Sequence, residues 1–399
     1  MFKHLLFLIC VVAISYGTGM GTLQFIENYL DSKNANTYYD TFGDEASLEK
    51  TRHLELQKRS FSSPDNFTVY GSCELEDEDI HVIFSNKNNG FQVNTIGVGG
   101  TQSIIHAMNL GAIHDNIEGK KIVFIATVNW FKEGGIKRQY FTGNFSKVKY
   151  FSFLFNPRLS DSLKKRLAKR ILSVPKEKEV NYDIEKFYAR LYLLENRRSG
   201  ILRSIVDPFY RLYYKLSIVE DKYFAYKKLQ EYRKKGLPEV IKPVLENHDW
   251  AKVKSIGGEK EKAISNNEFN IRDRAYEHMK ARLLEEHRFI YPPDSPERED
   301  FLIFLEVCKE LGVRPLIVYF PNHGKIFDYY VQKFQLEHSK MQMQETHEWF
   351  VETVKSYGFE LADFADMEYV DYANIEYSHP GSLGLAYINE SISKFYQKS

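Results

Sequence analysis

The chain has 399 residues, which is enough to bury a substantial core in one large domain or two. Basic and acidic residues are equal in number, 54 of each, so no overall positive field indicates a nucleic-acid partner. The three cysteines exclude a disulfide framework, and the sequence has neither zinc-ligand spacing nor a nucleotide-binding glycine pattern. We therefore expect no metal, no cofactor and no nucleic-acid partner.

The N-terminus predicts a membrane anchor over residues 1–26. Residues 4–26 contain no Lys, Arg, Asp or Glu, and their first part, Leu5–Ile14, is strongly apolar. As a helix this segment would extend about 35 Å, which is enough to cross a lipid bilayer. Lys3 precedes it and acidic residues follow it, which favours a single pass with a cytoplasmic N-terminus and an extracytoplasmic body. A cleaved signal peptide is the alternative, although no clean A-x-A site is present.

The next segment leads to a strand and a turn. Residues 27–66 are polar and mixed in charge, and we interpret them as a stalk with some helix. The run Phe67–Tyr70 predicts a strand that ends at Gly71, and Ser72 and Cys73 then precede an acidic segment suited to a helix start. Such a turn can present a nucleophile at the carboxyl edge of a sheet, near backbone N–H groups. Alone, it also fits an ordinary strand-to-helix turn with a buried cysteine.

Strands and helices alternate through much of the remaining chain, with short glycine loops between them. This pattern predicts a parallel sheet with helices on both faces. We expect further strands at 91–96, 121–126, 315–320 and 359–362, and helices at 103–110, 299–311, 344–357 and 384–396.

The composition changes between about residues 156 and 271. Leu159–Leu172 and Ile184–Leu229 are rich in Lys, Arg, Tyr and Leu at helical spacing. We interpret this region as a helical insertion in an extracytoplasmic domain of residues 67–399. Its basic residues are typical of a solvated helix face, and a site for a polyanionic polymer is the alternative.

Several polar segments stand at predicted strand ends, outside which ligands bind in an open parallel sheet. Acyl transfer needs a nucleophile, a base, a group that orients the base, and donors for the oxyanion. A carboxylate three residues before a histidine can orient its ring, and glycine and asparagine amides can serve as donors. Each segment alone also fits an ordinary loop role. The segments are Ser72/Cys73, Gly97–Gly100, Asn129 and Glu376–His379.

This arrangement resembles the SGNH hydrolase superfamily, whose four short blocks occur here in order. The resemblance implies an α/β fold with a flavodoxin-like parallel sheet. It further implies that Cys73 is the nucleophile, that His379 oriented by Glu376 is the base, and that Gly99 and Asn129 form the oxyanion hole. The matching blocks are Gly71-Ser72-Cys73, Ile96-Gly97-Val98-Gly99, Thr127-Val128-Asn129 and Glu376-Tyr377-Ser378-His379.

Within this superfamily the chain more closely resembles the DltD family of D-alanyl-lipoteichoic acid biosynthesis. The resemblance extends from the predicted anchor to the C-terminus. The stretches that carry it are 70–75, 97–103, 119–123, 129–131, Phe141 with 144–146, 322–329, and His379-Pro380-Gly381 followed by Gly384.

The sequence departs from the family pattern near the site. Where the family usually has Gly-Ser-Ser-Glu, Cys73 replaces the second serine; Asp is usual at Glu376, Gln is common at Asn129, and Trp is usual at Leu385. A thiol ionises more easily than a hydroxyl, so cysteine can act as the nucleophile beside an imidazole base. We place Cys73 ahead of Ser72 as the nucleophile, and Ser72 is the alternative.

The resemblance implies a membrane-anchored acyltransferase or esterase that transfers D-alanyl groups to lipoteichoic acid outside the cell. Its implied partners are a membrane O-acyltransferase, a D-alanyl carrier protein system and membrane lipid. A cell-surface thioesterase or carbohydrate esterase is one alternative, and a non-catalytic assembly or carrier-docking factor on a degenerate SGNH scaffold is another. Substitution of Cys73 or His379 distinguishes an enzyme from a scaffold, because an enzyme loses its activity and a scaffold tolerates both substitutions.

Overall fold

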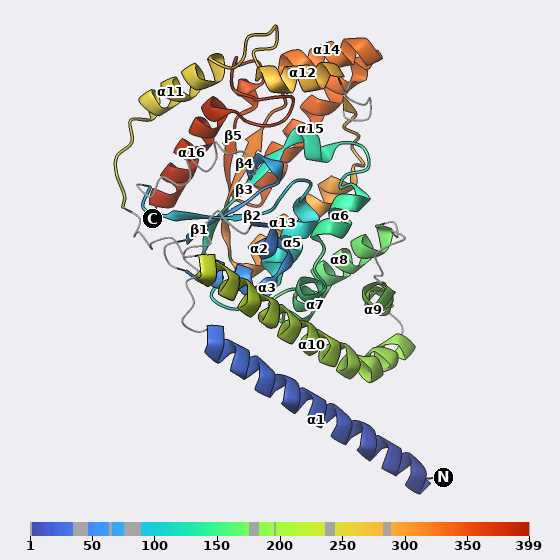
Figure 1. Ribbon diagram of the computed structural model, residues 1–399. Coiled ribbons are helices and arrows are strands. Elements are labelled where there is room, and N and C mark those ends of the chain that lie inside the picture. Colours follow the sequence, from blue (N-terminus) through green and yellow to red (C-terminus); the bar gives the residue numbers. More distant parts are fainter. Residues whose placement is uncertain are drawn as a thin grey trace.

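The computed structural model describes residues 2–34, 47–63, 66–75, 89–174, 183–194, 197–235, 244–281 and 289–398. These residues form a five-stranded sheet in the order β2-β1-β3-β4-β5, in which all neighbouring strands are parallel. Helices cover both faces of the sheet (Figure 1). The predicted α/β class and parallel sheet are therefore confirmed, and this strand order is the flavodoxin-like one.

The strands coincide closely with the predicted apolar runs. A strand covered on both faces reads as a nearly continuous apolar segment, and β3 is buried over its last six residues. The predicted acidic helix start after Cys73 is a short 3₁₀ turn, η2 (Cys73–Leu75), and residues 76–88 lie outside the described part. The strands are β1 (Asn66–Tyr70), β2 (Gln92–Ile96), β3 (Lys121–Thr127), β4 (Arg314–Phe320) and β5 (Glu360–Asp363).

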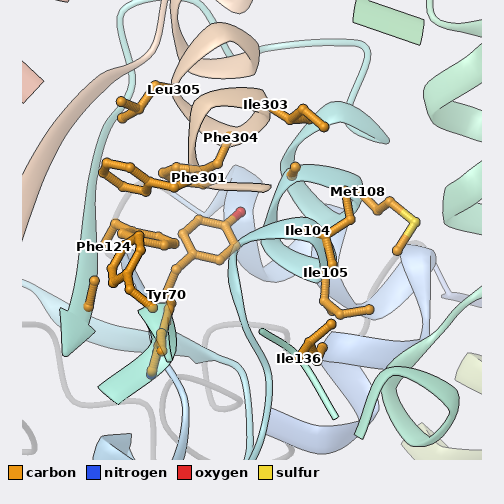
Figure 2. Close-up of a cluster of buried hydrophobic side chains, with 14 of the residues drawn as sticks. Tyr70, Ile104, Ile105, Met108, Phe124, Ile136, Phe301, Ile303, Phe304 and Leu305 are labelled. Carbon is orange, nitrogen blue, oxygen red and sulfur yellow. The ribbon is translucent and has the colours of Figure 1, made fainter. Parts of the chain in front are cut away.

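Alternate residues of each strand point to opposite faces and build two apolar cores. Tyr70 and Phe124 lie in the larger core with α5 and α13, where the rings of Phe124 and Phe304 stack with centroids 4.1 Å apart (Figure 2). Val69 and Val123, the preceding residues, pack on the other face with α16. The helices around the sheet are α5 (Ser103–Gly111), α6 (Arg138–Asn144), α7 (Lys147–Phe155), α13 (Pro296–Leu311), α14 (Gly324–Phe334), α15 (Glu337–Ser356) and α16 (Ser382–Gln397).

The N-terminal region differs from its prediction. A single helix, α1 (Phe2–Asn34), includes the expected anchor, but among the described residues no helix has the length and hydropathy needed to cross a membrane. The spanning anchor is therefore not confirmed. Part of the expected stalk forms α2 (Ser47–Arg52) and α3 (Leu54–Ser62), which pack on the sheet. The buried Lys50 donates a 3.0 Å hydrogen bond to Asn94 of β2, so this polar segment belongs to the fold.

The expected insertion is helical. Its elements are α8 (Asp161–Ser173), α9 (Asp183–Leu193), α10 (Arg197–Lys235) and α11 (Trp250–Lys262), and the helical region continues beyond the predicted end at residue 271 with α12 (Asp273–Ala281). The two parts of the insertion lie at different places. In Figure 1, α8 to α10 lie beside α7 near α1, whereas α11 and α12 lie near α16 and α14.

Gly97 allows the ends of β1 and β2 to approach each other closely. Its φ of +128° suits glycine, and a Cβ atom there would lie 1.9 Å from the carbonyl oxygen of Gly71. That oxygen also lies 2.9 Å from Nε2 of the buried His106. Burial lowers the pKa of His106 to about 3, so the ring is neutral and donates its Nε2–H to Gly71. The turn before Cys73 therefore depends on the absence of a side chain at Gly97 and on the hydrogen bond from His106.

The second half of the insertion is clamped to the start of α16. The buried Glu261 accepts hydrogen bonds from the guanidinium of Arg272, at 2.9 and 2.7 Å, and from the backbone N–H of Ser382, at 2.8 Å. The backbone N–H of Arg272 donates to the carbonyl oxygen of Ile375, at 3.2 Å. This clamp, Glu261 with Arg272, therefore holds both sides of the loop at residues 375–382.

We expect Glu261→Gln to reduce the free energy of unfolding by about 2–3 kcal/mol, because it removes the charge partner of Arg272 from a buried position. Glu259→Gln on the exposed side of α11 is the control and should change little. Urea denaturation of both variants measures the difference. Equal stability of the two variants would contradict a structural role for the clamp.

Gly97→Ala should destabilise the protein more than Gly119→Ala does. Both positions have positive φ, so each substitution incurs a backbone penalty of about 1–2 kcal/mol. Only at Gly97 does the new methyl group also collide with the backbone, because open space surrounds Gly119. Thermal unfolding of the two variants checks this, and similar melting temperatures would show that the β1 and β2 ends can separate at little cost.

Candidate active site

The candidate site lies at the carboxyl ends of β1 and β3. In this strand order the connections from β1 and β3 leave in opposite directions across the sheet, and ligands bind at that switch point. Cys73 begins η2, which follows β1 after Gly71 and Ser72, and Asn129 lies in η3 (Val128–Phe131) directly after β3. Two of the predicted site residues are therefore placed here by the sheet itself.

Cys73, His379 and Glu376 form a chain of close polar contacts. Nε2 of His379 lies 2.7 Å from Sγ of Cys73, and Nδ1 of the same ring lies 2.7 Å from Oε1 of Glu376. The carboxylate occupies one ring nitrogen, so the other nitrogen faces the thiol. This is the geometry that a nucleophile, a base and its orienting group require.

The surroundings of Glu376 favour its ionised form. Burial opposes ionisation, but the hydrogen bond and charge of His379 and two hydrogen bonds from Ser378 outweigh it and lower the pKa of Glu376 to about 2. The backbone N–H and the hydroxyl of Ser378 donate these two bonds, at 3.2 and 3.1 Å. Glu376 is therefore an anion at neutral pH and acts as a fixed acceptor for the imidazole.

The pKa of His379 is shifted the other way. Burial lowers it, but Cys73 and, to a smaller extent, Glu376 raise it, so that the pKa of His379 is well above its ordinary value. A protonated imidazole beside a thiol stabilises the thiolate, which is the nucleophilic form of cysteine. The neighbouring sulfur and carboxylate therefore both favour a proton on the His379 ring.

Ser72 is directed elsewhere. Its side chain is buried, and its hydroxyl accepts a 2.9 Å hydrogen bond from the backbone N–H of Gly100 and donates a 3.4 Å hydrogen bond to the carbonyl oxygen of Val98. Its backbone N–H donates to Glu74. The structure thus brings His379 to Cys73 and ties Ser72 into the glycine loop that follows β2.

Gly99 and Asn129, the predicted oxyanion donors, line the same cavity as Cys73. The side-chain oxygen of Asn129 is buried and has no hydrogen-bond partner in the described structure. A bound oxyanion would need the NH₂ group of this side chain, because the oxygen can only accept hydrogen bonds. Gly99 lies between Val98 and Gly100, which both form hydrogen bonds with the Ser72 hydroxyl, so the loop is fixed next to Cys73.

Glu74 is a site residue to which the sequence analysis assigns no role. It is buried, and this burial raises its pKa, although His379 and hydrogen bonds from Ser72 and the Trp130 side chain act in the opposite direction. Glu74 follows Cys73 directly, and Trp130 follows Asn129. Both residues lie in stretches that resemble the family, which is the signal that could have identified them.

Hydrogen bonds beneath the site hold the loop that carries His379. The hydroxyl groups of Tyr377 and Tyr291 lie 2.7 Å apart, and the side-chain amide of Asn322 donates to both, at 2.8 Å. The carbonyl oxygen of Tyr377 accepts from the backbone N–H of His323, at 2.8 Å. The segment after β4, which contains Asn322 and His323, therefore supports the site without entering it.

The cavity over Cys73 has a volume of about 1120 Å³. Residues of the insertion from Ile271 to Met279 form one of its walls, which the sequence analysis did not predict because their charges resemble those of any solvated helix. The acids among the lining residues are Glu74, whose pKa burial raises, and Glu376, which pairs with His379. The cationic residues in the lining are Lys132, Lys137, Arg272 and Arg274.

Comparison with known proteins agrees with the resemblance described above. The chain is 28% identical to Protein DltD of Bacillus subtilis (strain 168) over 353 residues, covering 86% of each chain. It is 25% identical to Protein DltD of Staphylococcus aureus (strain NCTC 8325 / PS 47) over 346 residues, covering 85% of this chain and 83% of the relative. The family model described as DltD protein matches residues 44–397. Because this match covers most of the sequence, the chain belongs to the DltD family.

Proposed function

We propose that this protein is an acyltransferase of teichoic acid D-alanylation, and that Cys73 carries the D-alanyl group. The proposal rests chiefly on the contact of His379 with Cys73 on one side and Glu376 on the other, both at 2.7 Å. A non-catalytic scaffold has no need of an oriented imidazole at a thiol. As the resemblance to the DltD family implies, the protein works at the outer face of the cell membrane. There an O-acyltransferase and a D-alanyl carrier protein system supply the acyl group.

In the first half of the reaction, Sγ of Cys73 attacks the carbonyl carbon of the donor and its proton passes to Nε2 of His379. The N–H groups of Cys73 and Gly99 and the Asn129 amide stabilise the oxyanion. The tetrahedral intermediate then breaks its bond to the leaving group, which takes the proton from His379. The product is a D-alanyl thioester on Cys73.

In the second half, a hydroxyl of the acceptor gives its proton to His379 and attacks the thioester. The C–S bond breaks, the D-alanyl ester of the acceptor is released, and Cys73 regains its proton from the imidazolium. A thioester is a good acyl donor to an alcohol because the thiolate is a better leaving group than an alkoxide. Cysteine at this position therefore suits the second half of the reaction, in which the thiolate leaves and the acceptor oxygen takes the acyl group.

The charges of the cavity favour a polyanionic acceptor. Lys137 and Arg274 lie in its lining, and the two acids there are a buried carboxyl and a partner of His379. The polyol-phosphate chain of lipoteichoic acid carries a phosphodiester in each unit, to which guanidinium and ammonium groups bind well. We therefore propose that the polymer lies across this basic wall while one of its hydroxyls reaches Cys73.

The central test measures cell-wall D-alanine esters in a deletion strain that carries wild type, Cys73→Ala, Ser72→Ala or His379→Ala at matched protein levels. We expect Cys73→Ala and His379→Ala to lose the esters. Ser72→Ala should retain part of them, because it removes two loop hydrogen bonds, each worth about 1 kcal/mol, and not the nucleophile. Mass spectrometry of the Ser72→Ala protein should find the D-alanyl adduct on Cys73.

The other outcomes identify the alternatives. If Ser72→Ala matches the His379→Ala defect while Cys73→Ala retains the esters, the nucleophile is Ser72. If all variants restore wild-type ester levels, the protein is a non-catalytic assembly or carrier-docking factor, and the acyl-transfer proposal fails.

Lys137→Ala combined with Arg274→Ala should weaken the acceptor step selectively. We expect the KM for the polymer to rise about tenfold, because charge-assisted contacts to phosphate are lost, while formation of the Cys73 thioester is unchanged. Lys340→Ala combined with Lys394→Ala, which removes two cations outside the cavity lining, is the matched control. A rise in KM with a short neutral polyol acceptor would contradict the phosphate role.

Glu376→Gln and Cys73→Ala should both lower the pKa of His379, and Cys73→Ala should lower it more. Cys73 is the larger of the two influences that raise the pKa of His379, so removing either one lets the imidazolium lose its proton at lower pH. NMR titration of ¹⁵N-labelled histidine side chains measures the shift, with Glu345→Gln as a remote control. An unchanged His379 midpoint in both variants would show that the three groups do not interact in solution.

A further inference from the structure

The oxyanion donors of the proposed reaction come from three separate segments of the chain. The N–H of Cys73 follows β1, the N–H of Gly99 follows β2, and the side-chain amide of Asn129 follows β3. An oxyanion hole is effective only if its donors already point at one position when the negative charge develops there. The turns that carry the donors must therefore be held against one another.

The pairing of the strands does not by itself fix these turns. The last paired residues of β1 and β3 are Tyr70 and Phe124, and both precede the turns that carry the donors. Towards β2, the hydroxyl of Ser72 joins the first turn to the next loop through its hydrogen bonds with Val98 and Gly100. Towards β3, a different group is needed.

Glu74 joins the turn after β1 to the turn after β3. Its Oε2 accepts a 2.8 Å hydrogen bond from the backbone N–H of Ser72, and its carboxyl group also accepts from its own N–H and from the side chain of Trp130. In the sequence, Ser72 directly precedes Cys73 and Trp130 directly follows Asn129. One carboxyl group therefore bonds to the neighbours of two oxyanion donors.

The contact between Glu74 and Trp130 is enclosed by the protein, since each residue is only 3% exposed. The indole ring also lies against the ring of His106, with centroids 6.2 Å apart, and His106 donates to the carbonyl oxygen of Gly71. Hydrogen bonds to a carboxylate are stronger in such surroundings than in water. The indole is thus fixed by two groups that both bond to the turn before Cys73.

The set of donors around Glu74 requires an acid at this position. A carboxylate only accepts hydrogen bonds, so it can serve three N–H groups at once. A glutamine of the same size would direct its own NH₂ group at one of these donors. The three hydrogen bonds also favour the ionised carboxylate and so oppose the effect of burial, which raises the pKa of Glu74.

We propose that Glu74 is a positioning residue that holds the turn of Cys73 against the turn of Asn129, so that their donors converge on one oxyanion. It acts through these turns and not on the reacting atoms. This inference rests on the acyl-transfer proposal, and it gives a role to the acid that directly follows the nucleophile.

The test compares two reactions of the Cys73 thiol in the full chain, with Cys10→Ser as background and Cys308 buried. In the first, the sulfur attacks p-nitrophenyl acetate through a tetrahedral oxyanion and releases p-nitrophenolate. In the second, the sulfur displaces iodide from the saturated carbon of iodoacetamide, so no carbonyl oxyanion forms. Both reactions need the thiolate, but only acetylation needs the oxyanion donors.

We expect Glu74→Gln to slow acetylation about 100-fold, the size of effect that follows loss of an oxyanion donor, and to slow alkylation less than about threefold. Trp130→Phe removes the N–H donor and keeps an aromatic ring, so acetylation should fall about tenfold. The double variant should be no slower than Glu74→Gln, because both changes break the same contact. Glu352→Gln, exposed on α15, is the matched control and should change neither rate.

Several results would overturn the inference. Acetylation of Glu74→Gln at the wild-type rate would show that the carboxylate is not needed, and equal loss of both reactions would show a general disruption of the site. Multiplied effects in the double variant would show that Glu74 and Trp130 act separately. If wild type is alkylated and not acetylated, the acyl-transfer proposal fails as well. If Glu74→Gln does not fold, the ratio of the two rates in Trp130→Phe decides.

Discussion

The contact between Cys73 and His379 joins residues 306 positions apart, and it depends on fixing an irregular loop. No helix or strand supports the backbone from residue 368 to 381, so its polar groups need other partners. The N–H of Ile375 donates to the carbonyl oxygen of His379, at 3.0 Å, and that of Gly381 donates to Ala373, at 2.7 Å. These bonds close the loop on itself and aim the imidazole at the thiol.

The helical insertion is the second support of this loop. Arg272 holds Ile375 through its backbone and Glu261 through its side chain, and Glu261 in turn holds the N-terminus of α16. Arg272 also lines the cavity over Cys73. One part of the insertion therefore positions the proposed base and borders the proposed acceptor path, while its other part, α10, lies beside α1.

Two carboxyl groups act on His379 in different environments. Glu376 accepts two hydrogen bonds from Ser378, which help to keep its pKa low, whereas burial raises the pKa of Glu74. Such a division gives one permanent anion to orient the imidazole and one carboxyl group that holds the backbone of Ser72. Neighbouring carboxyl groups separated in this way are common where acid–base chemistry takes place.

The sequence by itself determined the parallel sheet, because strands buried on both faces must be apolar runs, and it determined the residues at the strand ends. Tertiary structure decided what those residues face: Ser72 and Cys73 are adjacent and small, and only the approach of His379 and Gly100 separates their roles. It also decided that Lys50 is buried and that Arg272 lines the cavity. Composition cannot reveal these placements, because a charged side chain is buried or directed into a site only when distant residues supply its hydrogen-bond partners.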